Sequence, residues 1–155
     1  MSNRTPGRAD EPPMGKVMQP ITLTNSYDEE NVGRGHLRAD QVHSIEIEAL
    51  VDTGATMLVL PSDAVSRLGL LVAGYRRVRY ADGRTAEVPW VSGVGIKILG
   101  RETVTNALVE AAGTTPLLGQ IPLEELDLLV DPKSRELRVN PASPDAPLLD
   151  ILSAA

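Results

Sequence analysis

Apolar and polar residues follow one another in short strand-like runs along much of the chain, most clearly in residues 45–51. The letters IEIE at residues 45–48 alternate between the two classes, and ALV at residues 49–51 is apolar throughout. A strand has this pattern when it runs from a surface into a core, because successive side chains point to opposite faces. The pattern therefore predicts a strand whose last residues are buried.

Further runs bounded by turn residues predict more strands. They lie at residues 16–23, at 77–80 and 85–90 around a turn at 81–84, at 94–99 and 103–109 about residues 100–101, and at 127–130 and 136–139 around a turn at 131–134. The Asp82-Gly83 dipeptide is a strong hairpin signal. These runs predict three antiparallel hairpins in addition to the first strands.

Helical signals are few. Ser62 is a candidate cap for a helix over residues 63–68, whose apolar positions have helical spacing. Pro122 suits the first turn of a second short helix after Gly119. Residues 25–35 are polar and predict a loop. The chain is therefore expected to be mostly β, with one or two short helices.

Length and composition indicate one domain between two tails. Residues 1–14 are rich in Pro, Gly and charge and predict a flexible N-terminal tail, residues 15–140 form the expected domain, and residues 141–155 form a C-terminal tail. A hydrophobic content of 42% allows a proper core. Because Phe is absent and aromatics make up only 3%, Leu, Val, Ile and Ala must fill that core.

Charge and residue usage argue against several classes of partner and cofactor. The chain has no cysteine and only two histidines, which excludes disulfides and thiolate metal sites and gives no zinc-ligand spacing. A net charge of −6 disfavours a general nucleic-acid binder. No segment resembles a signal peptide or approaches the roughly 20 apolar residues that span a bilayer. We expect a soluble cytoplasmic protein with no cofactor, metal or membrane partner.

Candidate chemistry begins at Asp52, directly after the apolar end of the first predicted strand. A bare carboxylate is costly there, so it must be held by local donors or share a proton with a partner group, and both arrangements are associated with acid-base chemistry. Gly54 allows the backbone to turn tightly. Asp, Thr and Gly are common turn formers, and the tripeptide alone is also consistent with a simple hairpin turn. Since apolar residues 57–61 follow at once, we expect the turn to be buried between two core segments.

A second informative segment lies at residues 116–126. Leu117 and Leu118 are followed by Gly119 and then by the predicted short helix. A glycine at this point lets a strand pass close beside the Asp52 turn.

Together, residues 49–56 and 116–126 resemble the retropepsin-like aspartic proteases. That family has two apolar residues followed by Asp-Thr-Gly-Ala, and later two apolar residues and a glycine before a short helix. Ala55 fits this pattern, whereas two-lobed pepsin-like enzymes usually have Ser or Thr there. The resemblance covers roughly residues 44–139 and implies an acid-protease β-barrel, closed or partly open, with a flap hairpin.

The resemblance also implies roles for individual residues. Asp52, Thr53 and Gly54 take the catalytic positions, and Ala55 lies next to the substrate. The hairpin over residues 77–90 takes the position of the flap, with Ala81, Asp82 and Gly83 near the substrate and Gly83 at its tip; an ordinary sheet hairpin is the alternative. Retroviral flaps are richer in glycine, and Thr56 and Met57 stand where some of those enzymes have acidic residues that bind substrate. Subsite contacts are therefore not carried over.

A single Asp-Thr-Gly decides the expected assembly. Aspartic protease chemistry uses two facing carboxylates that share one proton. The nearest internal echo, residues 129–132, has Pro132 in place of Thr and no following glycine, so it predicts a turn. The second carboxylate must then come from Asp52 of a second copy across a two-fold axis. We expect a homodimeric aspartic endopeptidase acting on peptides or proteins; the alternative is a dimerisation or peptide-binding module with weak or no hydrolysis.

The predicted flap hairpin also carries a local excess of basic and aromatic residues. They are Tyr75, Arg76, Arg77, Arg79, Tyr80 and Arg84. The cluster is compatible with an acidic peptide or RNA, although solvated faces of a hairpin are the favoured interpretation. Trp90 could lie at the base of the flap or line a subsite, but core packing is favoured for a lone Trp.

Overall fold

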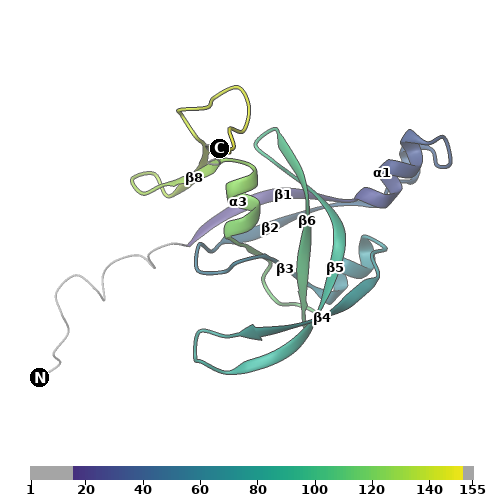
Figure 1. The fold of residues 1–155 in the computed structure, drawn as a ribbon, viewed down its shortest axis with the longest axis horizontal. Coiled ribbons are helices and arrows are strands. Elements are labelled where there is room, and N and C mark those ends of the chain that lie inside the picture. Colours follow the sequence, from purple (N-terminus) through teal and green to yellow (C-terminus); the bar gives the residue numbers. More distant parts are fainter. Residues whose placement is uncertain (1–15, 152–155) are drawn as a thin grey trace, which may run out of the picture.

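The computed structural model describes residues 16–151, and strands dominate it (Figure 1). The strands are β1 (Val17–Asn25), β2 (Ser44–Val51), β3 (Leu58–Pro61), β4 (Val72–Arg79), β5 (Thr85–Ile98), β6 (Arg101–Glu110), β7 (Leu117–Leu118), β8 (Leu128–Asp131) and β9 (Glu136–Val139). The helices of this part of the chain are α1 (Ser26–Gly33), α2 (Ser62–Arg67) and α3 (Gln120–Glu125), with a 3-10 turn, η1 (Ala39–Gln41). The predicted tail over residues 1–14 lies outside the described residues.

Six strands close into a ring. The main sheet has the order β1-β2-β7-β3-β6-β5-β4, and β1 also pairs with β5, which joins the two ends of the first six strands. The β1–β2 and β1–β5 pairs are antiparallel. The predicted mostly-β barrel is therefore confirmed, and it is closed. Strand β4 is outside the ring and forms the edge of the sheet.

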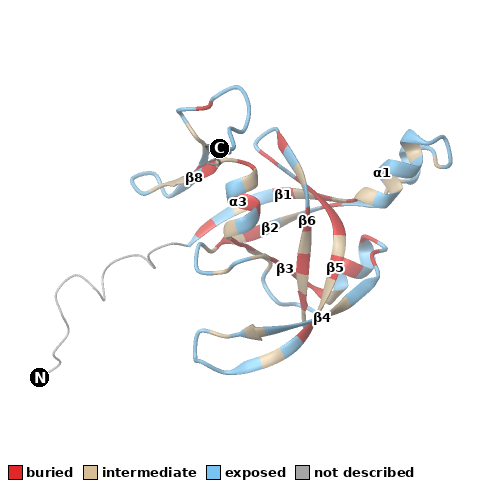
Figure 2. Cartoon of the chain, viewed as in Figure 1, coloured by how far each residue is buried: buried red, intermediate tan, exposed pale blue. Residues whose placement is uncertain are grey.

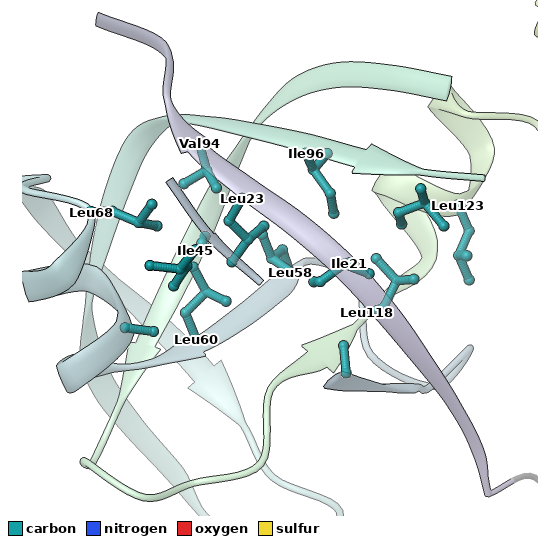
Figure 3. Packing of buried hydrophobic residues seen from close by; sticks show 14 of the residues in the cluster. Ile21, Leu23, Ile45, Leu58, Leu60, Leu68, Val94, Ile96, Leu118 and Leu123 are labelled. Carbon is teal, nitrogen blue, oxygen red and sulfur yellow. The ribbon is translucent and has the colours of Figure 1, made fainter. Parts of the chain in front are cut away.

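Aliphatic side chains fill the ring, as expected for a chain without Phe. Figure 3 shows Leu23, Ile45, Leu58 and Leu60 pointing toward one another from three different strands. Leu23, Leu58 and Leu60 have no exposed surface. Full burial of each such side chain contributes about 1.5–3 kcal/mol to folding. Figure 2 shows the buried positions concentrated in the ring strands, while the β4–β5 hairpin and α1 are mainly exposed or half-buried.

The predicted loop over residues 25–35 is wrong, because α1 forms there. Asn25 caps this helix through Oδ1, which accepts hydrogen bonds from the backbone N–H of Tyr27 at 3.0 Å and Asp28 at 3.2 Å. Asp28 and Glu29 in the first turn stabilise the helix because their negative charges lie near the positive end of its dipole. None of the residues of α1 is buried. The helix therefore has no apolar periodicity by which the sequence could have revealed it.

Two other boundaries differ from the predictions. Helix α2 begins at Ser62 itself, and Pro61 occupies the cap position without a side-chain hydrogen bond. The turn between β5 and β6 is formed by Leu99 and Gly100, which have φ angles of 51° and 81°. Arg101 is therefore the first residue of β6 and not a turn residue.

The β8–β9 hairpin forms as predicted, and the chain stays attached to the body beyond it. The Asp127 carboxylate accepts hydrogen bonds from the Ser143 hydroxyl, from Asn140 Nδ2 at 3.0 Å and from the Leu148 N–H at 3.1 Å. These donors, with the nearby Arg101 guanidinium, lower the pKa of Asp127. The ordered contacts thus continue past the predicted domain end at residue 140.

Arg101 secures the same segment from within the body. Its side chain is 6% exposed and donates to the carbonyl oxygens of Leu126, Asp127 and Ser143. A buried guanidinium needs such acceptors because its charge is costly to desolvate.

No helix in residues 16–151 is long and apolar enough to cross a membrane.

Candidate active site

Strand β7 brings residues 49–56 and 116–126 together. It pairs in parallel with the end of β2, where Val51 lies opposite Leu118, and antiparallel with β3, where Val59 lies opposite Leu117. The loop at residues 52–57 joins β2 to β3 and therefore passes around β7. The Asp52 N–H donates to the Leu118 carbonyl at 3.0 Å. This bond fixes the backbone of Asp52 at the end of β2, where the last two residues of the strand pair with β1 on one side and β7 on the other.

Backbone hydrogen bonds also tie the loop to the start of α3. The N–H groups of Gln120 and Ile121 donate to the carbonyl oxygens of Ala55 at 2.8 Å and Thr56 at 2.9 Å. A Cβ on Gly119 would lie 2.8 Å from the Ala55 carbonyl oxygen and closer still to that of Met57. The prediction that a glycine is needed for close passage beside the Asp52 loop is confirmed.

Asp52 is half-buried beside the exposed residues Thr53, Gly54 and Thr56, which together form an open rim of the loop. Its Oδ1 accepts a hydrogen bond from the Gly54 N–H at 2.9 Å. Asp52 and Ala55 are half-buried, whereas Thr53, Gly54 and Thr56 are exposed. The expected burial of this turn is therefore wrong for the single chain, because β7 and α3 support the loop without covering Thr53 and Gly54. Within residues 16–151, no hydrogen bond joins Asp52 to a second acidic side chain.

A hollow of about 280 Å³ adjoins the exposed side of the loop. It is lined by Thr53, by Gln120, Leu123 and Glu124 of α3, and by residues 127–130. Its wall combines leucines with polar groups, and Leu129 is 47% exposed beside it. The chain's own described residues thus leave the neighbourhood of Thr53 open.

The other predicted site residues lie in the turn of the β4–β5 hairpin. Ala81, Asp82 and Gly83 are exposed, Gly83 has φ 86°, and its N–H donates to the Tyr80 carbonyl at 2.9 Å. Figure 1 shows the hairpin extending out of the ring. In the described part of the chain, no hydrogen bond links this turn to the Asp52 loop. In the single chain, the Asp52 loop and the turn over residues 81–83 therefore lie on separate elements.

One contact of the hairpin was missed by sequence reasoning. The Tyr80 hydroxyl donates to Glu110 Oε1 at 2.7 Å, and this bond raises the pKa of Tyr80. Arg84 stacks over the Tyr80 ring at 4.6 Å. Glu110 ends β6, thirty residues away. The only available signal was strand alternation, which places Tyr80 on the same face as the half-buried Val78.

Trp90 does not pack in the core, so that interpretation is wrong. It is half-buried, and Arg76 lies over its ring at 4.6 Å. Gly74 faces Trp90 across the hairpin, and a Cβ there would lie 2.8 Å from the indole Nε1. The large ring is accommodated on the hairpin because its cross-strand neighbour has no side chain. The arginines at 76, 77, 79 and 84 are exposed, as predicted.

Residues 16–151 contain no group of three or more His, Cys, Asp or Glu side chains that could hold a metal ion. The Asp52 loop instead offers one carboxylate, one backbone donor to it and an exposed threonine. Carboxylates placed in this way serve in general acid-base chemistry.

Known proteins place these features in a family. The model of a family described as aspartyl protease matches residues 40–121, and no curated protein matches the chain. Among solved structures, the EIAV protease complexed with the inhibitor HBY-793 is similar at a TM-score of 0.48 and 20% identity, over 70% of this chain and 86% of that one. The family match spans more than half of the chain and includes both the Asp52 loop and the Gly119 segment. The chain therefore belongs to this aspartyl protease family.

Proposed function

We propose that the protein is an aspartic endopeptidase whose active site is completed by a second copy of the chain. One observation carries the proposal. The Asp52 carboxylate is held by the Gly54 N–H at an open rim, with Thr53 and Gly54 exposed beside it. A two-fold axis at this rim would bring a second Asp52 to face the first, and it would cover the two exposed residues.

The reaction follows from two carboxylates that share one proton. The ionised Asp52 accepts a proton from a water molecule held between the pair, and the water oxygen attacks the carbonyl carbon of the scissile peptide. The protonated Asp52 hydrogen-bonds the carbonyl oxygen and then gives a proton to the leaving amine as the C–N bond breaks. The Gly54 N–H donates to Oδ1 and so fixes the orientation of the Asp52 carboxylate. Thr53 would join the two loops through hydrogen bonds across the axis.

The substrate would lie as an extended strand between the Asp52 loop and the β4–β5 hairpin. The hairpin would act as a flap that excludes bulk water and offers backbone hydrogen bonds at Ala81, Asp82 and Gly83, while Ala55 lies on the opposite wall. The bond between Tyr80 and Glu110 supports this role, since it fixes the hairpin near its tip to the end of β6. Because the catalytic pair shares a proton, activity should be highest at acidic to mildly acidic pH.

A peptide-library cleavage assay tests the activity. We expect Asp52→Asn to reduce cleavage by at least about 10²-fold, the lower end of general acid-base contributions, while the fold is retained by circular dichroism. Asp40→Asn removes the same charge from an exposed position in η1 and should leave cleavage unchanged. Cleavage that survives in Asp52→Asn would overturn the proposal, whereas absence of cleavage by the wild-type protein would favour the peptide-binding alternative.

A further inference from the structure

Strand β4 presents an unpaired edge. It is the last strand of the main sheet and pairs only with β5 within the described residues. In an antiparallel pair, alternate residues of an edge strand point their N–H and C=O groups away from the partner. Residues 72–79 thus offer a row of backbone donors and acceptors to an added strand.

The two faces of this strand are different. The inward face carries Arg76 stacked on Trp90, the half-buried Val78, and Tyr80 bonded to Glu110 on the next alternate position. The outward face carries Tyr75, which is 69% exposed, and the exposed Arg77 and Arg79. The stacked and bonded side chains orient the hairpin, so the two outward arginines are presented together on one face.

Arg77 and Arg79 also stand out by charge. The hairpin over residues 72–90 has four arginines and two acidic residues, in a chain whose net charge is −6. Arg84 pairs with Asp82 at 3.9 Å, but in residues 16–151 neither Arg77 nor Arg79 lies within ion-pair distance of an acidic group. Glu87 lies opposite Arg77 in the strand register without pairing with it. The edge therefore offers two free cations on an otherwise acidic protein.

We propose that the β4 edge binds an acidic, extended peptide segment that adds to the sheet as a further strand. The segment carries carboxylates at alternate positions, because Arg77 and Arg79 are two residues apart and an added strand repeats that spacing on the same face. A third alternate position, apolar in character, meets Tyr75. Backbone hydrogen bonds give affinity and the two arginines select the acidic side chains. Peptide binding at the β4 edge is separate from the proposed proteolysis and does not require it.

Two other uses of the same residues make different predictions. Arginines on an edge strand can serve only to prevent self-pairing of exposed edges, and in that case no peptide binds. Single-stranded RNA would instead be bound through phosphates and base stacking on Tyr75, without dependence on strand register.

The test is a fluorescence-anisotropy titration with full-length Asp52→Asn protein, so that the peptide is not cut. One peptide has a β-forming sequence with acidic residues at positions i and i+2, and its isomer of equal composition has them at i and i+1. A one-residue shift moves a side chain to the other face of a strand. The isomer therefore offers only one carboxylate to the arginines. Arg77→Ala/Arg79→Ala is compared with Arg67→Ala/Lys133→Ala, which removes the same charge from exposed positions elsewhere.

We expect the alternating peptide to bind about three- to tenfold more tightly than its isomer, since exposed ion pairs contribute modestly. Arg77→Ala/Arg79→Ala should lose this preference, and the Arg67/Lys133 variant should keep it. Equal binding of the two peptides, or unchanged binding in the Arg77/Arg79 variant, would overturn the proposal. Tighter binding of a single-stranded RNA than of the peptide would also overturn it. So would self-association of the Arg77/Arg79 variant together with no peptide binding by the parent protein, because the arginines would then serve only to prevent pairing between edges.

Discussion

The backbone of Gly119 lies directly against the carbonyl oxygen of Ala55, at a distance that leaves no room for a side chain. A Cβ at Gly119 would stand 2.8 Å from that oxygen, and the N–H of the next residue, Gln120, donates to the same oxygen at 2.8 Å. The contact joins the loop that carries Asp52 to the start of α3. Glycine is therefore required here by close approach of two backbones.

Gly119→Ala should destabilise the protein because the clashing atoms belong to the backbone and cannot rotate away. We expect a loss of about 2 kcal/mol in the free energy of unfolding, measured by urea denaturation. Gly33→Ala is the matched control, since a Cβ there meets nothing within 4 Å. Equal stability of the two variants would show that the loop can move away from α3 at little cost.

Tyr80→Phe should loosen the β4–β5 hairpin while keeping the ring under Arg84. The variant removes only the hydroxyl that donates to Glu110 at 2.7 Å, a bond to a charged acceptor worth about 1.5–3 kcal/mol. We expect faster amide hydrogen exchange in residues 78–86. Tyr75→Phe, on the exposed face of the same strand, should leave exchange unchanged. A double-mutant cycle with Glu110→Gln would show no coupling between the two residues if the contact is unimportant.

The hydrogen bonds that attach residues 140–148 to the Asp127 carboxylate should weaken at acidic pH. Hydrogen bonds from Ser143, Asn140 and Leu148 hold the pKa of Asp127 below its ordinary value of 3.8. The stabilisation is complete above that value and is lost as the pH falls through the lowered pKa of the folded state. Asp28 and Asp131 are shifted in the same direction. Unfolding free energy should therefore fall on acidification below about pH 4.

Asp127→Asn separates the contribution of that residue. Its unfolding free energy should depend less on pH below about pH 4 than that of the parent protein, because the titrating acceptor is gone. An unchanged pH dependence would mean that other carboxylates control acid stability.

The sequence predicted the contact between the Asp52 loop and the Gly119 segment better than it predicted the structure around them. The Asp52 loop and Gly119 carry local signals, an apolar strand end and a glycine before a helix, and the structure joins them. Helix α1 escaped because none of its residues is buried, so nothing imposed a helical period. The contacts from Tyr80 to Glu110 and from Arg101 to Ser143 escaped because they connect residues 30 and 42 positions apart. Such contacts depend on how the ring closes, which alternation within single strands does not encode.

Subunit mixing tests the shared active site most directly. Wild-type protein is mixed with an equal amount of Asp52→Asn at constant total concentration, and peptide cleavage is measured after the subunits have exchanged. Asp40→Asn, mixed in the same way, should leave cleavage at its full value. If each site needs one Asp52 from each of two copies, activity should fall to about one quarter of the wild-type value, because only dimers of two wild-type subunits cleave. A fall to only about one half, as for independent single-chain sites, would contradict the shared site.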